Sequence, residues 1–158
     1  MFPTRVVRGG YSVQLIQRVV YALINLHPWH SMAVHFPIAL ASVALLTIVV
    51  AVWRRSEPLE QFAFLNLALA SISTALAGLA GLRDLFFRFD GSAPYVNAKV
   101  FLGVSLLLLT GVTTVTRRRR ADLLWNPDTI VLTVAAFAGS FLLAAVLGFL
   151  GGSILYGF

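Results

Sequence analysis

Four long apolar segments dominate the chain, and each is about as long as a helix that crosses a bilayer. They cover residues 31–53, 61–82, 97–116 and 129–150, and Lys99 is the only Asp, Glu, Lys or Arg within them. The hydrocarbon core of a membrane requires about 20 consecutive apolar residues in a helix. The apolar positions are continuous, whereas the strands of a membrane barrel alternate apolar with polar positions. The pattern therefore predicts an all-α integral membrane protein that forms a four-helix bundle.

A different pattern precedes these segments. Residues 11–26 carry polar side chains at Gln14, Gln17, Arg18, Tyr21 and Asn25, and spacings of three and four place them on one helical face. The stretch is short for a bilayer span, and it contains an arginine. We predict an N-terminal segment, residues 1–26, with an amphipathic helix in the outer membrane interface, followed by a four-span domain, residues 27–158. A helix that covers a partner subunit would show the same pattern.

The composition supports the membrane assignment and removes some chemistries. Hydrophobic residues make up 59% of the chain and charged residues 11%, against about 25% charged residues in an ordinary soluble domain. The mean hydropathy is +0.87. The chain has no cysteine, which excludes cysteine-ligated iron–sulfur clusters, covalently attached haem and disulfides on this chain.

The arginines predict the orientation of the bundle. The connections after the first and third spans must lie on the same side of the membrane, and they hold six arginines: Arg54, Arg55, Arg117, Arg118, Arg119 and Arg120. The positive-inside rule places these connections in the cytoplasm, so both termini and the histidines face the periplasm across a bacterial inner membrane. We also expect the arginine run to contact anionic lipid headgroups. It lacks interleaved aromatic residues and a soluble module, so we expect no nucleic-acid partner.

All three histidines lie in one short stretch, HPWHSMAVHFPIAL, residues 27–40. His27 and His30 have a spacing that suits a metal ion, although a proline lies between them. His30 and His35 are candidate ligands of a b-type haem, but the other three spans contain no histidine for the opposite axial position. A second ligand would have to come from another subunit or a second copy. In the structural alternative, His35 hydrogen-bonds inside the bundle while His27 and His30 lie among the headgroups.

Further patterns concern helix shape and packing. Pro37 removes a backbone hydrogen bond and predicts a kink within residues 33–37. Small residues recur every four positions in the second and fourth spans, at Ala70, Thr74, Gly78, Ser140, Ala144, Gly148 and Gly152. Such stripes let helix backbones approach closely in lipid, so we expect packing seams within the bundle or with a partner. The same physics leads us to expect that polar side chains of the second span bridge helices; these are Asn66, Ser71, Ser73 and Thr74.

The connection between the second and third spans, RDLFFRFDGSAPY at residues 83–95, is predicted as an interfacial loop with a turn at Gly91 and Pro94. Arg83 and Asp84 are placed to pair or to reach toward the headgroups. No carboxylate lies deep in any span, so an ion pathway or proton relay lacks its usual parts. A small-molecule transporter is therefore the least favoured class.

Three motifs resemble a known family. HPWHSMAVHFPIAL at 27–40, GLAGLRD at 78–84 and FLGGSILYGF at 149–158 are similar to the motifs of the bacterial membrane-protein family called domain of unknown function 2231. The resemblance implies a four-helix membrane domain, which in some relatives stands beside redox modules such as cytochrome c or Rieske domains. The matching residues are His27, Pro28, His35, Phe36, Pro37, Asp84, Gly151, Gly152 and Tyr156. The chain departs from the family at Tyr95-Val96-Asn97 and at Gly157, where relatives often carry a histidine.

These patterns contain no catalytic constellation. We therefore expect a non-catalytic integral membrane subunit that packs into a larger bioenergetic or electron-transfer complex and contributes helix and lipid contacts. The alternative is a redox subunit that binds b-type haem, or a metal, through the cluster His27, His30 and His35 at the outer face of the membrane.

Overall fold

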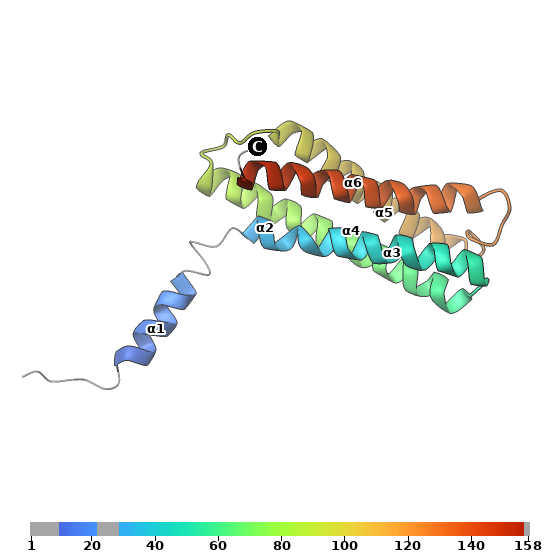
Figure 1. Cartoon of the computed structure of the whole chain (residues 1–158), viewed down its shortest axis with the longest axis horizontal. Helices are drawn as coiled ribbons and strands as arrows, with labels where there is room; N and C mark the ends of the chain where they lie inside the picture. The colour runs from blue at the N-terminus through green and yellow to red at the C-terminus, as the bar shows by residue number, and fades with distance from the viewer. Residues whose placement is uncertain (1–9, 22–28, 157–158) are drawn as a thin grey trace, which may run out of the picture.

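The computed structural model describes residues 10–21 and 29–156. It contains six helices in this part of the chain, with bounds α1 Gly10–Tyr21, α2 Trp29–Ala33, α3 His35–Arg54, α4 Glu57–Arg88, α5 Val96–Arg119 and α6 Ile130–Tyr156 (Figure 1). Four of the segments are long and apolar enough to cross a membrane, at Trp29–Arg54, Glu57–Phe87, Val96–Arg119 and Ile130–Ser153. The predicted all-α class with four membrane helices is confirmed.

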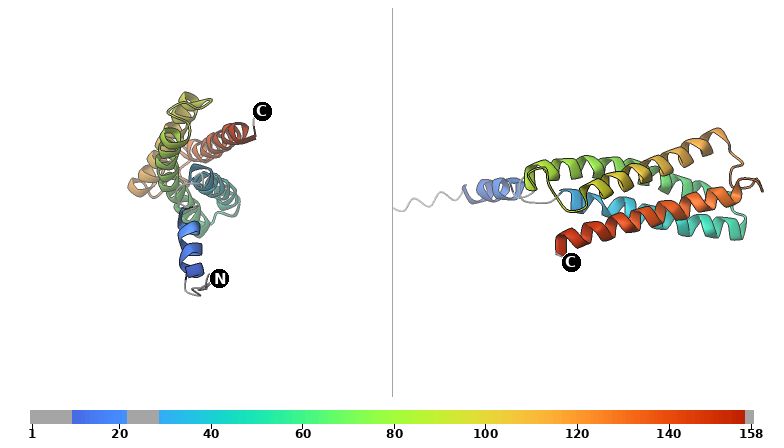
Figure 2. Two further views of the ribbon diagram at one scale, coloured as in Figure 1. Left: turned by 90° about the vertical axis from the view of Figure 1, so that its left-hand side faces the viewer. Right: turned by 90° about the horizontal axis from the view of Figure 1, so that it is seen from above.

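The four spans form a ring in which each packs on two neighbours. α3 contacts α4 and α6, and α5 contacts the same two helices from the other side. The α3–α4 and α5–α6 connections lie at one end of the bundle (Figures 1 and 2). The α4–α5 connection, α2 and the end of α6 lie at the opposite end. All six arginines of the two connections are thus at one end, which we call the arginine end; the other is the histidine end.

The tightest packing is toward the arginine end. A cluster of buried residues from α3, α4, α6 and the α5–α6 connection includes Ile48, Leu67, Leu124 and Phe137. Phe64 meets Phe137 edge to face, with ring centroids 5.1 Å apart, an arrangement that aromatic quadrupoles favour. A smaller cluster of Ala41, Leu106 and Ala144 follows toward the middle. Most other large apolar side chains point outward, as expected for a bundle whose surroundings are themselves apolar.

The helix of the first span is interrupted within the region in which Pro37 led us to expect a disturbance. Val34 separates α2 from α3 as a turn residue, and its backbone N–H still donates to the carbonyl of His30 at 3.0 Å. Pro37 is buried in the first turn of α3, where its missing N–H leaves the carbonyl four residues earlier without its usual donor. The interruption is limited to Val34, which itself keeps helical dihedral angles, φ −66° and ψ −21°; the kink expected within residues 33–37 stays a prediction.

The second span is longer than the sequence predicted. We expected a helix end at residue 82 and a loop from residue 83, but α4 continues to Arg88 and its end is bonded by Phe89 N–H to Leu85 O at 3.3 Å. The loop prediction for residues 83–88 was wrong. The chain turns only where Asp90 and Gly91 adopt positive φ angles of 46° and 78°, the region that glycine tolerates best. The charged pair Arg83 and Asp84 therefore lies on a helix.

The small-residue stripe of α4 lies only partly on its packed face. Ala70 and Thr74 are buried, whereas Gly78 is exposed and a Cβ built on it would have nothing within 4 Å. The packed face continues instead through Ala77 and Gly81. An α-helix has 3.6 residues per turn, so each step of four residues rotates the side chain by about 40° beyond a full turn. A stripe of every fourth residue therefore leaves the packed face after about two turns.

The stripe of α6 contacts α3 at close range. Ser140 and Ala144 are buried, and a Cβ built on Gly148 would lie 2.8 Å from Ile38 Cδ1. Gly152, at the far end of the stripe, has nothing within 4 Å of a built Cβ. The stripe thus packs within the chain over its first three members.

Three of the four polar side chains of α4 do not bridge helices as we expected. The fourth, Ser71, faces α5, with its Oγ 3.5 Å from a Cβ built on Gly111. Asn66 donates to Phe62 O at 2.8 Å, and Ser73 and Thr74 both donate to Ala70 O, at 3.0 and 2.7 Å. Within the described residues, each buried side-chain nitrogen or oxygen has a hydrogen-bond partner. A carbonyl three or four residues back is always within reach of a hydroxyl in a helix, so these groups satisfy themselves without a neighbouring helix.

Candidate functional site

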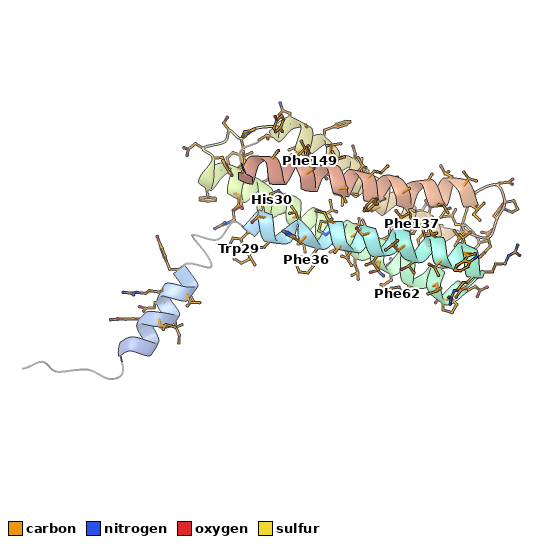
Figure 3. All side chains as sticks on the ribbon, viewed as in Figure 1. Trp29, His30, Phe36, Phe62, Phe137 and Phe149 are labelled. Carbon is orange, nitrogen blue, oxygen red and sulfur yellow. The ribbon has the colours of Figure 1, made fainter. Side chains whose placement is uncertain are left out.

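His30 joins the first span to the second. Its backbone N–H donates to Asp84 Oδ2 at 3.0 Å, and its ring Nδ1 lies 2.9 Å from Ala77 O. A carbonyl oxygen only accepts, so Nδ1 carries the proton. The ring packs against α4 at Gly81, where a built Cβ would lie 2.9 Å from Nδ1. Figure 3 shows His30 where α2 meets α4.

Asp84 is the acceptor that makes this junction. Asp84 is only 4% exposed. Its two carboxylate oxygens accept hydrogen bonds from His30 N–H and from Arg83 Nη1, the latter at 3.1 Å. The first N–H groups of a helix have no partner within the helix, so Asp84 caps α2 from a different span. The pairing of Arg83 with Asp84 is one of the two outcomes we expected. The contact with His30 was missed, because residues 54 positions apart share no local pattern.

His35 is solvent- or lipid-exposed, in contrast to His30, whose ring packs against α4. It is exposed on the outer surface of the bundle, and its ring Nδ1 donates to Ser31 O at 2.7 Å. With the proton on Nδ1, the neutral ring keeps an unprotonated Nε2, and this is the nitrogen that metals bind when the other is tied to a carbonyl. Met32, three positions before it, and Phe36, directly after it, are also exposed, and Figure 3 shows Phe36 on the outer side of the bundle.

The histidines are therefore arranged differently from the structural alternative. That alternative placed His35 inside the bundle, and this part was wrong, because His35 is exposed on the outside. It also placed His30 among the headgroups; the ring of His30 lies against α4, and its depth in the membrane stays a prediction. The five-residue spacing puts the two rings on different faces of the helix, about 140° apart at 100° per residue. His27 lies outside the described residues.

Substituting alanine at Gly81 and at Gly78 gives a sharp test of the His30 contact. Gly81→Ala places a methyl group 2.9 Å from His30 Nδ1, and because the ring is held by Ala77 O we expect a loss of about 1–3 kcal/mol in the free energy of unfolding. Gly78→Ala, one turn earlier, meets nothing within 4 Å, and helix propensity predicts a gain of up to about 1 kcal/mol. Unfolding of the purified protein in mixed micelles of increasing SDS content measures both. Equal effects of the two substitutions would contradict the contact.

The arginine end contains a second buried polar cluster. Glu60 is 1% exposed and accepts from Arg117 Nε and from Trp125 Nε1, both at 2.6 Å. The guanidinium of Arg117 also lies over the ring of Phe64, 5.6 Å from its centroid, within the range of a cation–π contact. This cluster ties the start of α4 to the end of α5 and to the following connection. Sequence reasoning assigned Arg117 to topology alone and missed Glu60, 57 positions away.

The described residues offer limited means of holding a metal. They contain no group of three or more His, Cys, Asp or Glu side chains that could enclose an ion, whereas a structural zinc site needs four ligands. His35 Nε2 is a single outward ligand. Haem iron requires only axial ligands from the protein, so a haem fits this donor better than a bare ion does.

A bundle of four long helices, with apolar side chains outside and buried ionic clusters at both ends, defines an integral multi-pass membrane protein. The model of the family described as "Predicted membrane protein (DUF2231)" matches residues 26–158, and the chain belongs to this family, as its motifs predicted. No curated protein and no solved structure matches the chain.

Proposed function

We propose that the chain is a non-catalytic integral membrane subunit that packs into a larger bioenergetic or electron-transfer complex. The observation that carries this proposal is the exposure of His35 on the outer face of the first span. Ionisable side chains within membrane spans almost always face the interior of a bundle or a polar partner. An imidazole directed away from its own bundle, one or two turns inside the span, is therefore best explained by a second membrane component on that face.

The remaining polar groups support a structural role for the bundle itself. His30, Asp84 and Arg83 connect two spans, and Glu60 and Arg117 connect two others. Hydroxyls in the spans bond to carbonyls of their own helices. Polar groups that are already hydrogen-bonded between or within helices are not available to react with a substrate. For this reason we favour a subunit over an enzyme.

The association is tested by gentle purification of the tagged protein from its native membrane. We expect other membrane subunits to co-purify. We also expect His35→Ala to reduce their recovery at least about tenfold, because a hot-spot residue at the centre of an interface contributes about 2 kcal/mol or more. Leu108→Ala, which alters a similarly exposed side chain on α5, is the matched control and should leave the recovery unchanged. Isolation as a lone monomer would remove the proposal.

The orientation follows from the positive-inside rule, with the arginine end in the cytoplasm of a bacterial cell. Arg118, Arg119 and Arg120 are exposed there and are free to contact anionic headgroups. On the other side, α1 would lie in the outer interface through its apolar side chains, including Val13, Ile16 and Val20, which are exposed.

Single cysteines test this orientation without background, because the chain has none of its own. Ser92→Cys lies in the exposed α4–α5 connection and Arg119→Cys at the end of α5. We expect a membrane-impermeant maleimide to label Ser92→Cys in intact spheroplasts and Arg119→Cys only after permeabilisation. Labelling in the reverse order would invert the assignment.

A second candidate is a redox subunit that binds b-type haem or a metal through His35, since the ring of His30 is turned toward α4. The tether from His35 Nδ1 to Ser31 O favours it, because it fixes the ring and leaves Nε2 as a Lewis base. An absorption spectrum and elemental analysis of the purified protein test this candidate. A protein with neither a Soret band nor a bound metal would eliminate it.

A further inference from the structure

The outward face of α5 combines exposed arginines with an exposed apolar stripe at the arginine end. We infer that an anionic phospholipid binds there, with its phosphate at the guanidinium groups of Arg118 and Arg119 and one acyl chain along the helix. The site deepens the lipid contacts of the proposed function, on which it rests, by assigning one class of lipid to two residues. Three features support it: the position of each arginine around the helix, the unpaired charge, and the length of the apolar stripe.

Arg117, the first residue of the arginine run, is directed into the bundle. It lies four residues after Thr113, which is buried, and residues four apart share one face of a helix. Its Nε donates to the carboxylate of Glu60 at 2.6 Å, and its side chain is only 21% exposed. Arg117 is therefore bound within the protein and is not available to a lipid headgroup.

Arg119 lies on the other side of the same helix. It follows Val115 by four residues and Val112 by seven, and both of these side chains are exposed. At 100° per residue, positions 117 and 119 are about 160° apart around the helix axis. Arg118 is exposed as well. Neither Arg118 nor Arg119 forms an ion pair with a residue that the structure describes, and the next carboxylate along the chain, Asp122, pairs with neither. Two positive charges thus face outward without a bound counter-charge.

The apolar stripe that leads to these arginines has the length of one leaflet. Leu108, Val112 and Val115 are 60%, 62% and 48% exposed, and their spacings of four and three place them on one face of α5. Leu108 lies at the middle of the span Val96–Arg119. From Leu108 to Arg119 the helix rises about 16 Å at 1.5 Å per residue, and half of the hydrocarbon core is about 15 Å thick. When the stripe faces an acyl chain, the arginines are therefore at the level of the headgroup.

The charge of the face selects an anionic lipid over a zwitterionic one. A guanidinium presents its N–H donors in a planar fork that matches the oxygens of a phosphate. In phosphatidylcholine the choline offsets the charge of the phosphate, whereas phosphatidylglycerol carries a net negative charge. Each basic residue near an anionic membrane surface strengthens association about fivefold. An acidic protein segment would also neutralise the arginines, but it would not require an apolar stripe as long as one leaflet.

A tryptophan placed on the stripe reports which lipid is adjacent. The full-length protein with Val115→Trp, four residues before Arg119, is reconstituted in vesicles of brominated phosphatidylcholine, which quenches tryptophan fluorescence on contact. The brominated lipid is then replaced stepwise by unbrominated phosphatidylglycerol or unbrominated phosphatidylcholine. The difference from the protein without the added tryptophan isolates the reporter. We expect phosphatidylglycerol to displace the quencher at least about fivefold more effectively than phosphatidylcholine does.

Arg118→Gln together with Arg119→Gln should reduce this lipid preference to about one. Arg54→Gln together with Arg55→Gln is the matched control, because it removes the same charge from exposed arginines at the end of α3, a helix that packs on α4 and α6. The control should leave the preference at Val115→Trp unchanged. Three results would overturn the site: no preference with all arginines present, a preference that survives the substitutions at 118 and 119, or an equal fall in the control.

Co-purification from the native membrane tests the proposed function separately. If phosphatidylglycerol shows no preference and the substitutions at 118 and 119 remove the accompanying subunits, an acidic partner occupies this face; the lipid site is then excluded and the proposed function stands. If the preference is present and no subunit accompanies the protein, the lipid site stands and the proposed function fails.

Discussion

Glu60→Ala is expected to destabilise the bundle by about 3–5 kcal/mol, the largest effect of any single substitution considered. The carboxylate is buried and accepts from Arg117 Nε and Trp125 Nε1 at 2.6 Å each. Its removal leaves a guanidinium with little exposure and an indole N–H without their acceptor. Unfolding in mixed micelles of increasing SDS content, followed by tryptophan fluorescence and circular dichroism, measures the loss.

Glu57 provides the control, because it lies in the same first turn of α4 but is exposed. Glu57→Ala should change the free energy of unfolding by no more than about 0.5 kcal/mol. The double substitution Glu60→Met with Arg117→Met should recover much of the loss, because an apolar pair of similar volume often replaces a buried ion pair at little cost. Equal stability of Glu60→Ala and Glu57→Ala would show that the buried cluster contributes nothing.

Asp84→Ala is expected to loosen the histidine end and to cost about 2 kcal/mol, the usual scale for a hydrogen bond to a charged group. The substitution removes the acceptor of the His30 backbone N–H, at 3.0 Å, and of Arg83 Nη1, at 3.1 Å. Because Arg83 is partly exposed, most of the loss comes from the uncapped start of α2. Hydrogen exchange of the α2 amides, followed by mass spectrometry, should accelerate in this variant.

Asp90→Asn is the matched control for this experiment, since Asp90 is an exposed carboxylate a few residues further along and asparagine tolerates its positive φ angle. It should alter neither the exchange of α2 nor the stability. Asp84→Asn keeps one carbonyl acceptor and is expected to fall between the wild type and Asp84→Ala. Unchanged α2 exchange in Asp84→Ala would mean that the contact with His30 does not hold the first span in place.

These clusters show where reasoning from the sequence stops. Glu60 and Arg117 are separated by 57 positions, and His30 and Asp84 by 54. No periodicity connects such residues, and each alone is consistent with a headgroup contact or a topology signal. Only the Arg83–Asp84 pairing, between neighbours in the chain, was within reach of the sequence.

The sequence also did not predict which face of each span packs inside the bundle and which face is exposed. Gly78 and Gly81 are both glycines of one apolar helix, yet one meets nothing and the other touches His30. In a soluble protein, polar residues mark the outside of a helix. In these spans the outside is apolar as well, so composition does not distinguish the packed face from the lipid-facing one.

The sequence by itself determined the class of the protein, its four spans, the break near Pro37 and its family. It could do so because the thickness of the bilayer core dictates how long an apolar run must be, and because proline acts on its own helix turn. The tertiary structure alone decided that His30 faces α4 while His35 faces outward, and that Glu60 and Asp84 anchor the two ends. Those outcomes depend on which helices pack against each other. The sequences of four similarly apolar helices do not indicate which pairs will be in contact.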